Sequence, residues 1–135
     1  MIDLDHFKAI NDSVGHAGGD EVLRSFANTA LTVMRQSDIF GRIGGEEFAA
    51  LLTHTTLEGA RVIGERLLER VRQQPAVWAS VAVPYTVSVG IGLADEGQTV
   101  QQLMAHADHA LYTAKRQGRD CLVLAGPGAQ PVTAC

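Results

Sequence analysis

The chain has 135 residues, the usual size of one domain, and its composition of 46% hydrophobic and 19% charged residues excludes a wholly disordered protein. Its apolar runs are too short to span a membrane, and its net charge of −4 argues against general binding to the backbone of nucleic acids. Two cysteines are too few for a disulfide-stapled secreted domain, and no secretory signal is visible, so the sequence favours the cytoplasm.

The N-terminal segment predicts one strand and two helical pieces. Residues 1–5 alternate apolar and acidic side chains, as at the end of a strand. Since a central strand normally begins further upstream, we expect the domain to be truncated at its N-terminus. Apolar residues at helical spacing predict helices over 7–13 and 20–34. Three glycines separate these helices: Gly15, Gly18 and Gly19.

A hairpin is predicted after the second helix. Two short apolar runs, over 38–43 and 46–53, flank Gly44 and Gly45. Both glycines tolerate the positive φ that a type I′ turn requires, so the turn is expected at this pair.

Two more helices are predicted, each with a capping box at its start. Each box pairs a threonine with a polar side chain three residues later: Thr55 with Glu58, and Thr99 with Gln102. Pro75 is expected to end the first of these helices, and Gly118 the second.

The remaining apolar segments complete an α+β fold. Residues 85–93 alternate apolar with small residues, which predicts a half-buried strand whose small-residue face allows close packing, and 121–124 predicts a last short strand. A hairpin among helix-linked strands implies a mostly antiparallel central sheet flanked by helices. We expect one domain over 1–124 and a disordered tail over 125–135.

Acidic residues gather at two places where packing alone does not explain them. Asp3 and Asp5 end an apolar strand, and Glu46 and Glu47 stand between a turn and an apolar run. Neighbouring carboxylates repel each other and lose hydration on burial, so a cation such as Mg²⁺ would offset them. The alternative is that these carboxylates are simply solvated at strand ends.

Five segments resemble, in order and spacing, the GGDEF family of diguanylate cyclases, here as a GGEEF variant, over about residues 1–123. They are Asp3-Leu4-Asp5-His6-Phe7-Lys8, Asn11-Asp12 with Gly15-His16 and Gly19-Asp20, Arg42-Ile43-Gly44-Gly45-Glu46-Glu47-Phe48, Val87-Ser88-Val89-Gly90-Ile91-Gly92, and 107–115 with Gly118-Arg119. The resemblance implies a ferredoxin-like, nucleotidyl-cyclase palm that condenses two GTP into cyclic di-GMP and releases pyrophosphate.

The resemblance also implies a catalytic centre. Asp3, Glu46 and the backbone carbonyl of Leu4 would hold Mg²⁺, with Mn²⁺ as a possible substitute. Glu46 or Glu47 would help to deprotonate the attacking 3′-hydroxyl, and the residues do not decide between them. Lys8 would stabilise the transferring phosphoryl group.

The nucleotide-binding residues follow from the same resemblance. Asn11 and Asp20 would read guanine, with His16 nearby, and Lys115 and Arg119 would contact the phosphates. The further substrate contacts would come from Phe7, Arg42, Gly44 and Gly45. Two structural alternatives stay open: Asp20 could cap a helix, and the two cations could stabilise a helix C-terminus.

Arg35 and Asp38 match the family's RxxD motif, with Arg66 as a second arginine, and the resemblance implies that they bind the inhibitory product. Relatives carry a further helix and most of the first strand before Asp3, and this chain lacks both. Because one site would hold one GTP, catalysis implies a homodimer. Two alternatives remain: a cyclic di-GMP or GTP receptor with little turnover, and a dimerisation domain without a nucleotide role.

Overall fold

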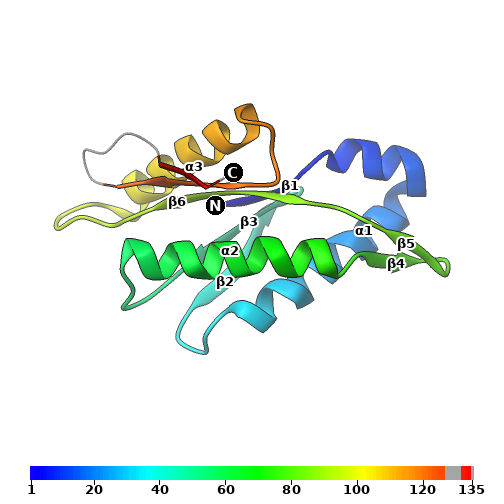
Figure 1. The fold of residues 1–135 in the computed structure, drawn as a ribbon, viewed down its shortest axis with the longest axis horizontal. Coiled ribbons are helices and arrows are strands. Elements are labelled where there is room, and N and C mark those ends of the chain that lie inside the picture. Colours follow the sequence, from blue (N-terminus) through cyan, green and yellow to red (C-terminus); the bar gives the residue numbers. More distant parts are fainter. Residues whose placement is uncertain (127–131, 135) are drawn as a thin grey trace.

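The computed structural model describes residues 1–126 and 132–134. Three helices and eight strands occupy these residues (Figure 1). In chain order they are β1 (Ile2–Leu4), α1 (Phe7–Val33), β2 (Ile39–Gly44), β3 (Glu47–Leu51), α2 (Leu57–Gln73), β4 (Ala76–Trp78), β5 (Val81–Val83), β6 (Val87–Gly92), α3 (Val100–Arg116), β7 (Leu122–Ala125) and β8 (Val132–Ala134). None of the helices in the described part of the chain is long and apolar enough to cross a bilayer.

The central sheet has the strand order β2-β3-β1-β6-β7-β8. All neighbouring strands in it are antiparallel except β6 and β7, which are parallel. The α+β prediction with a mostly antiparallel sheet is therefore confirmed. The short strand β1 lies between β3 and β6, so whatever it carries at its end is flanked by strands on both sides.

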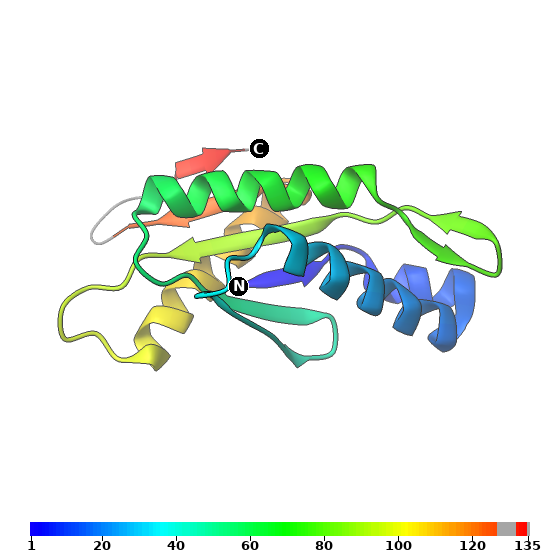
Figure 2. The same ribbon diagram turned by 90° about the horizontal axis from the view of Figure 1, so that it is seen from below.

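Helices cover the two faces of the sheet. Figure 1 shows α2 on one face and α3 on the other, and Figure 2 shows α2 beside the second half of α1. On the α1–α2 face the aromatic ring of Phe26 packs edge-on against Phe48, with the ring centroids 4.7 Å apart. On the other face α3 lies directly over Gly90 of β6. The first four residues of β6 are thus buried on both faces, which corrects the expectation of a half-buried strand.

The helix α1 changes direction at one residue. Gly15 has φ 77° and ψ 168°, which no helix accommodates, and helical backbone resumes at His16. The second helical segment thus begins four residues earlier than predicted, and Gly18 and Gly19 lie inside it. Their role is close packing instead: a Cβ on Gly18 would lie 2.5 Å from Val14 Cγ2.

The β2–β3 hairpin forms with a turn one residue later than predicted. Gly44 pairs with Glu47, which leaves Gly45 and Glu46 at the turn. Of the two glycines only Gly45 has a positive φ, so the type I′ turn at Gly44-Gly45 is wrong. The register shifts between Arg42 and Gly44, so a bulge takes up the extra residue.

The helix boundaries follow the predicted signals with one shift. Thr99 and Gln102 form the predicted capping box of α3. The cap of α2 is Thr56, whose hydroxyl accepts from the Gly59 amide, so the box predicted at Thr55 is wrong. The helix α2 ends before Pro75, as predicted.

Two short elements were missed from the sequence. The hairpin of β4 and β5 turns at Ala79 and Ser80, both with positive φ (49° and 63°). A turn of this kind normally contains glycine or asparagine, so the sequence held no signal for it. At the C-terminal end, where a disordered tail was expected, Ala125 belongs to β7. The backbone of Val132–Ala134 forms β8, which pairs with Leu122–Leu124 of β7. The rest of that expectation, residues 127–131 and 135, lies outside the described residues.

Candidate active site

The end of β1 places one carboxylate on the α3 side of the sheet. Ile2 and Leu4 are buried in the main core with α1 and α2. Because side chains alternate along a strand, Asp3 faces the opposite side, together with its cross-strand partner Glu47. There the Lys115 ammonium of α3 donates a hydrogen bond to Asp3 Oδ2 at 2.8 Å. The structure thus brings together two predicted site residues that are 112 positions apart in sequence.

The Asp3 carboxylate lies in an environment that disfavours its charge. Only 5% of the residue is exposed. Burial raises the pKa of Asp3, the bond from Lys115 opposes that rise, and the nearby charges of Glu46 and Glu47 add to it. A bound cation would stabilise the charged form of this carboxylate, so the electrostatics of Asp3 fit a metal-binding carboxylate.

We expect Asp3→Asn to raise the melting temperature at pH 7 by a few degrees when Mg²⁺ and nucleotide are absent. The folded state holds the Asp3 proton more tightly than the unfolded chain, so the stabilising contribution is present at acidic pH and is lost as pH rises through the raised pKa. The Asp3→Asn substitution should therefore raise the melting temperature most at neutral pH. The difference from the wild type should shrink at pH values below the ordinary pKa of aspartate.

Thermal melts between pH 3.5 and 8 measure this difference. The exposed Asp12, replaced by asparagine, is the matched control and should change little, because its contact with Lys8 is long (3.9 Å) and solvated. An Asp3→Asn variant that melts at or below the wild-type temperature at pH 7 would contradict the prediction.

The β2–β3 turn is joined to the end of β1. The Leu4 amide donates to the Glu46 carbonyl at 3.2 Å, so Glu46 lies beside the last residues of β1. Arg42 donates from Nε to the Gly45 carbonyl at 2.7 Å, which closes the turn. Beyond the adjacent residues of the chain, no atom lies within 4 Å of a Cβ built on Gly44 or Gly45, so the backbone here is open to a ligand.

The candidate metal ligands at the end of β1 are all oxygen atoms. Asp3, Glu46 and the Leu4 carbonyl are the kinds of ligand that Mg²⁺ takes, usually one or two carboxylates completed by water and substrate phosphates. The described residues contain no group of three or more His, Cys, Asp or Glu suited to a metal ion. The residues present therefore fit a metal that completes its coordination with backbone, water and nucleotide oxygens.

The three predicted phosphate-binding cations are placed differently. Lys115 already contacts Asp3. Lys8 is exposed on the first segment of α1, 3.9 Å from Asp12. Arg119 is exposed in the loop after α3. The structure thus joins Lys115 to the carboxylate site and leaves Lys8 and Arg119 with their charged ends in solvent.

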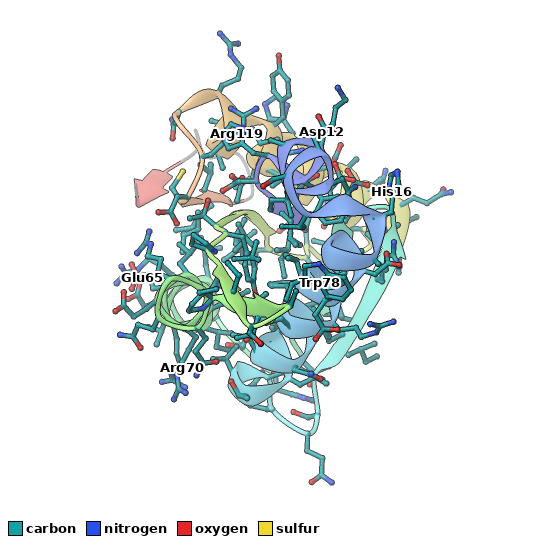
Figure 3. All side chains as sticks on the ribbon, turned by 90° about the vertical axis from the view of Figure 1, so that its right-hand side faces the viewer. Asp12, His16, Glu65, Arg70, Trp78 and Arg119 are labelled. Carbon is teal, nitrogen blue, oxygen red and sulfur yellow. The ribbon has the colours of Figure 1, made fainter. Side chains whose placement is uncertain are left out.

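The predicted guanine-reading residues meet across the break in α1. A Cβ on Gly19 would lie 1.8 Å from Asn11 Oδ1 and 3.3 Å from the Phe7 ring, so both side chains rest against the Gly19 backbone. Asp20 follows directly and is exposed. It lies within the second helical segment, so the alternative that it caps this helix is wrong. His16 is exposed just after the break (Figure 3).

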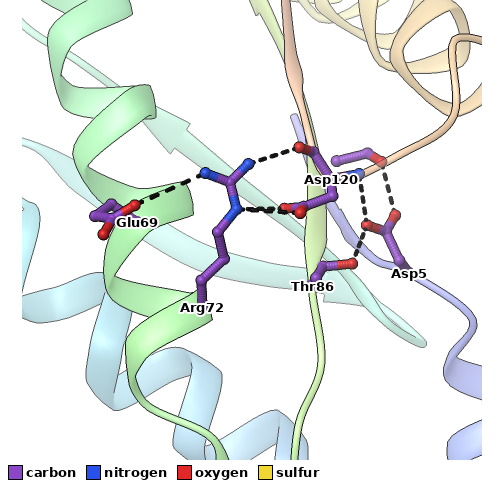
Figure 4. Close-up of polar contacts among 6 residues, drawn as sticks. Asp5, Glu69, Arg72, Thr86 and Asp120 are labelled. Atoms are coloured by element: carbon purple, nitrogen blue, oxygen red, sulfur yellow. Dashed lines mark hydrogen bonds and ion pairs between the residues drawn. The ribbon is translucent and has the colours of Figure 1, made fainter. Parts of the chain in front are cut away.

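Asp5 has a structural role that the sequence did not indicate. It is buried, and Oδ2 accepts from Thr86 Oγ1 at 2.7 Å and from the Asp120 amide at 3.0 Å (Figure 4). Oδ1 accepts from Ser88 Oγ at 2.7 Å. With three donors satisfied, Asp5 ties the end of β1 to β6 and to the α3–β7 loop, whereas the sequence grouped it with Asp3 as a metal-site carboxylate.

The predicted product-binding pair forms a closed local contact. Arg35 donates to Asp38 from Nε at 3.2 Å and from a terminal nitrogen at 2.8 Å, and it also donates to the Thr53 carbonyl at 2.7 Å. These bonds from Arg35 lower the pKa of Asp38. Arg66 is exposed on α2 and makes no hydrogen bond or ion pair to this pair in the described structure.

Two shallow cavities lie elsewhere on the molecule. One of about 280 Å³ is formed by the β6–α3 loop and the start of α3, and one of about 390 Å³ lies between α1 and the α2–β4 connection. Neither is lined by a predicted site residue.

Comparison with known proteins gives one consistent family. Residues 1–121 match the family model described as Diguanylate cyclase, GGDEF domain. Diguanylate cyclase DgcP of Pseudomonas aeruginosa is 41% identical over 125 residues, which are 93% of this chain and 19% of that protein. This chain therefore spans about a fifth of the length of that curated relative.

Solved structures agree with the sequence relatives. Diguanylate cyclase SiaD of Pseudomonas aeruginosa, solved with its activator SiaC, has a TM-score of 0.88 and 41% identity over 92% of this chain and 48% of that one. The GGDEF domain of DgcB from Caulobacter crescentus, solved with c-di-GMP, has a TM-score of 0.85 and 30% identity over 95% of this chain and 75% of that one.

Proposed function

Since the chain belongs to the GGDEF family of diguanylate cyclases, we propose that it joins two GTP molecules into cyclic di-GMP and releases two pyrophosphates. The observation that carries this proposal is the meeting of three segments at the end of β1, where Asp3, the Glu46 turn and Lys115 come together. Carboxylates and a lysine at one open corner suit phosphoryl transfer, which depends mainly on positioning and charge neutralisation.

The proposed reaction forms two phosphodiester bonds. The 3′-hydroxyl oxygen of each GTP bonds to the α-phosphorus of the other, the bond from that phosphorus to the β-phosphate bridging oxygen breaks, and the hydroxyl proton leaves to a base. Glu46 or Glu47 would accept that proton. Because the domain offers one such corner, two copies would have to face each other, and a homodimer in the cytoplasm is the proposed working form.

We propose that Asp3, Glu46 and the Leu4 carbonyl hold Mg²⁺, or Mn²⁺ in its place. The ion would neutralise charge on the triphosphate and lower the pKa of the attacking hydroxyl. Lys115 would then shift its contact from Asp3 to the phosphates, with Lys8 and Arg119 as further phosphate ligands.

Guanine recognition would use the residues gathered at the break in α1. An Asp20 carboxylate can accept from the N1–H and exocyclic amine of guanine, and Asn11 can contact its remaining edge, with Phe7 and His16 alongside. Adenine would leave the carboxylate without donors, which gives discrimination.

The direct test is GTP turnover with Mg²⁺, followed as cyclic di-GMP by chromatography. We expect product from GTP, none from ATP, none in EDTA, and a rate per protein molecule that rises with protein concentration. Saturable GTP binding without cyclic di-GMP at any protein concentration would contradict the cyclase proposal.

Arg35 and Asp38 are proposed to bind the product and so inhibit the enzyme. An Arg fork pairs well with guanine or phosphate acceptors. We expect Arg35→Ala to raise the inhibition constant of cyclic di-GMP about tenfold, the worth of one bidentate contact of about 1.4 kcal/mol, without lowering the initial rate.

Initial rates at increasing cyclic di-GMP measure this effect. The matched control is Arg24→Ala, which removes another exposed arginine paired with an acid three residues away. Unchanged inhibition in Arg35→Ala would contradict the product-binding role.

A receptor that binds cyclic di-GMP with little turnover is the second candidate. The intact pair of Arg35 and Asp38 favours it, because product binding at that pair requires neither a metal nor turnover. Saturable cyclic di-GMP binding that is lost in Arg35→Ala, together with no GTP turnover, would establish it. A domain with no nucleotide role would show no thermal stabilisation by either nucleotide.

A further inference from the structure

The loop between α3 and β7 holds an unusual backbone conformation. Gly118, Arg119 and Asp120 have φ of 115°, 67° and 47°, so three consecutive residues are in the left-handed region. Glycine adopts this conformation freely, but arginine and aspartate do so at a cost and keep it only where the surroundings fix it. Something must therefore hold Arg119 and Asp120 in place.

Asp120 is held on three sides. Its amide donates to Asp5 Oδ2 at 3.0 Å. Its two carboxylate oxygens accept from Arg72 Nε at 3.0 and 3.1 Å, and its carbonyl accepts from a terminal nitrogen of Arg72 at 2.9 Å (Figure 4). Arg72 therefore binds both the side chain and the backbone of Asp120, the residue that follows Arg119.

The two groups that hold Asp120 are themselves fixed. Asp5 is buried and accepts hydrogen bonds from Thr86, just before β6, and from Ser88 of β6. Arg72 projects from the last turn of α2, where Glu69 lies 3.8 Å from its guanidinium. The loop that carries Arg119 is thus clamped between the sheet and the end of α2.

The contact between Arg72 and Asp120 is poorly suited to stabilise the fold as a whole. The two side chains are 43% and 39% exposed, and exposed ion pairs contribute little to the free energy of unfolding. Its main effect is therefore local: it selects the conformation of one loop.

From this geometry we infer that Arg72 is a positioning residue for nucleotide binding: through Asp120 it holds the loop in the conformation that presents Arg119 to the phosphates. The inference rests on the proposed function, in which Arg119 contacts the triphosphate. Asp5 acts on the same loop from the buried side and, unlike Arg72, cannot be replaced without disturbing the core.

The test compares GTP and guanosine binding to Arg72→Gln by calorimetry. We expect GTP affinity to fall about tenfold, because phosphate contacts are lost, and guanosine affinity to stay unchanged. Arg70→Gln is the matched control, since Arg70 is exposed in the same last turn and loses the same charge; it should leave both affinities unchanged. In an Arg119→Gln background, Arg72→Gln should cause no further loss.

A second readout does not depend on nucleotide. The Asp120 amide should exchange its hydrogen faster in Arg72→Gln than in the wild type and in Arg70→Gln. Faster exchange in Arg72→Gln with unchanged GTP affinity would overturn the positioning role. So would a loss of GTP affinity that is equal in the wild-type and Arg119→Gln backgrounds. A loss of guanosine affinity as large as the loss of GTP affinity would overturn it as well. A wild-type domain that binds no GTP would refute the proposed function itself, and the exchange result would separate that failure from an error about the loop.

Discussion

For the proposed cyclase activity, Glu46→Gln is expected to lower the rate of cyclic di-GMP formation by about a hundredfold to a thousandfold. Glutamine keeps the size of the side chain and its place beside β1, where the Leu4 amide meets the Glu46 carbonyl. It removes the negative charge that would hold the metal and accept a proton, and the loss of one group that stabilises transition-state charge typically costs about 10²–10³ in rate. Initial rates at saturating GTP and Mg²⁺ measure the loss.

Two comparisons make the result specific to Glu46. Glu96→Gln, in an exposed loop distant in sequence from the site, makes the same chemical change and should keep the wild-type rate. Glu47→Gln tests the neighbouring carboxylate, which pairs across the sheet with Asp3. A Glu46→Gln variant that retains more than about a tenth of the activity, with an unchanged melting temperature, would remove Glu46 from the chemistry.

The sequence predicted Asp3, Glu46 and Lys115 as candidate site residues but not that Lys115 contacts Asp3. Charged side chains at the end of an apolar strand stand out in any sequence, and this drew attention to Asp3 and Glu46. The contact from Lys115 to Asp3 depends on how α3 lies across the sheet, and no local pattern encodes a contact over 112 positions. The structure also gives Asp3 and Asp5 different environments. Asp5, two residues further along the chain, accepts hydrogen bonds from three donors.

Turns were predictable where glycine is required and missed where it is not. Gly15 does break α1, as its residue type suggests. The position of the β2–β3 turn depends on the register shift between Arg42 and Gly44, which the Gly44-Gly45 pair does not reveal. The β4–β5 turn uses Ala79 and Ser80 in left-handed conformations, so its signal is absent from the sequence.

Gly90→Ala is expected to destabilise the domain by about 3 kcal/mol or more and to abolish activity with it. A Cβ on Gly90 would lie 2.1 Å from the Ala107 carbonyl oxygen and 2.2 Å from the Leu111 amide nitrogen. Both are backbone atoms of α3 and cannot rotate away. Reaching an ordinary contact of 3.4 Å would require α3 to move outward by more than about 1 Å, which would open the core between α3 and β6.

The loss of activity should follow from the same displacement, because α3 carries Lys115 to Asp3. Urea unfolding measures the change in stability, and Gly41→Ala on β2 is the control, since a Cβ there meets nothing within 4 Å. Gly41→Ala should shift the free energy of unfolding by no more than about 0.5 kcal/mol. Equal stability of the two variants would mean that α3 does not lie against Gly90 in solution, and the placement of Lys115 beside Asp3 would then lose its structural basis.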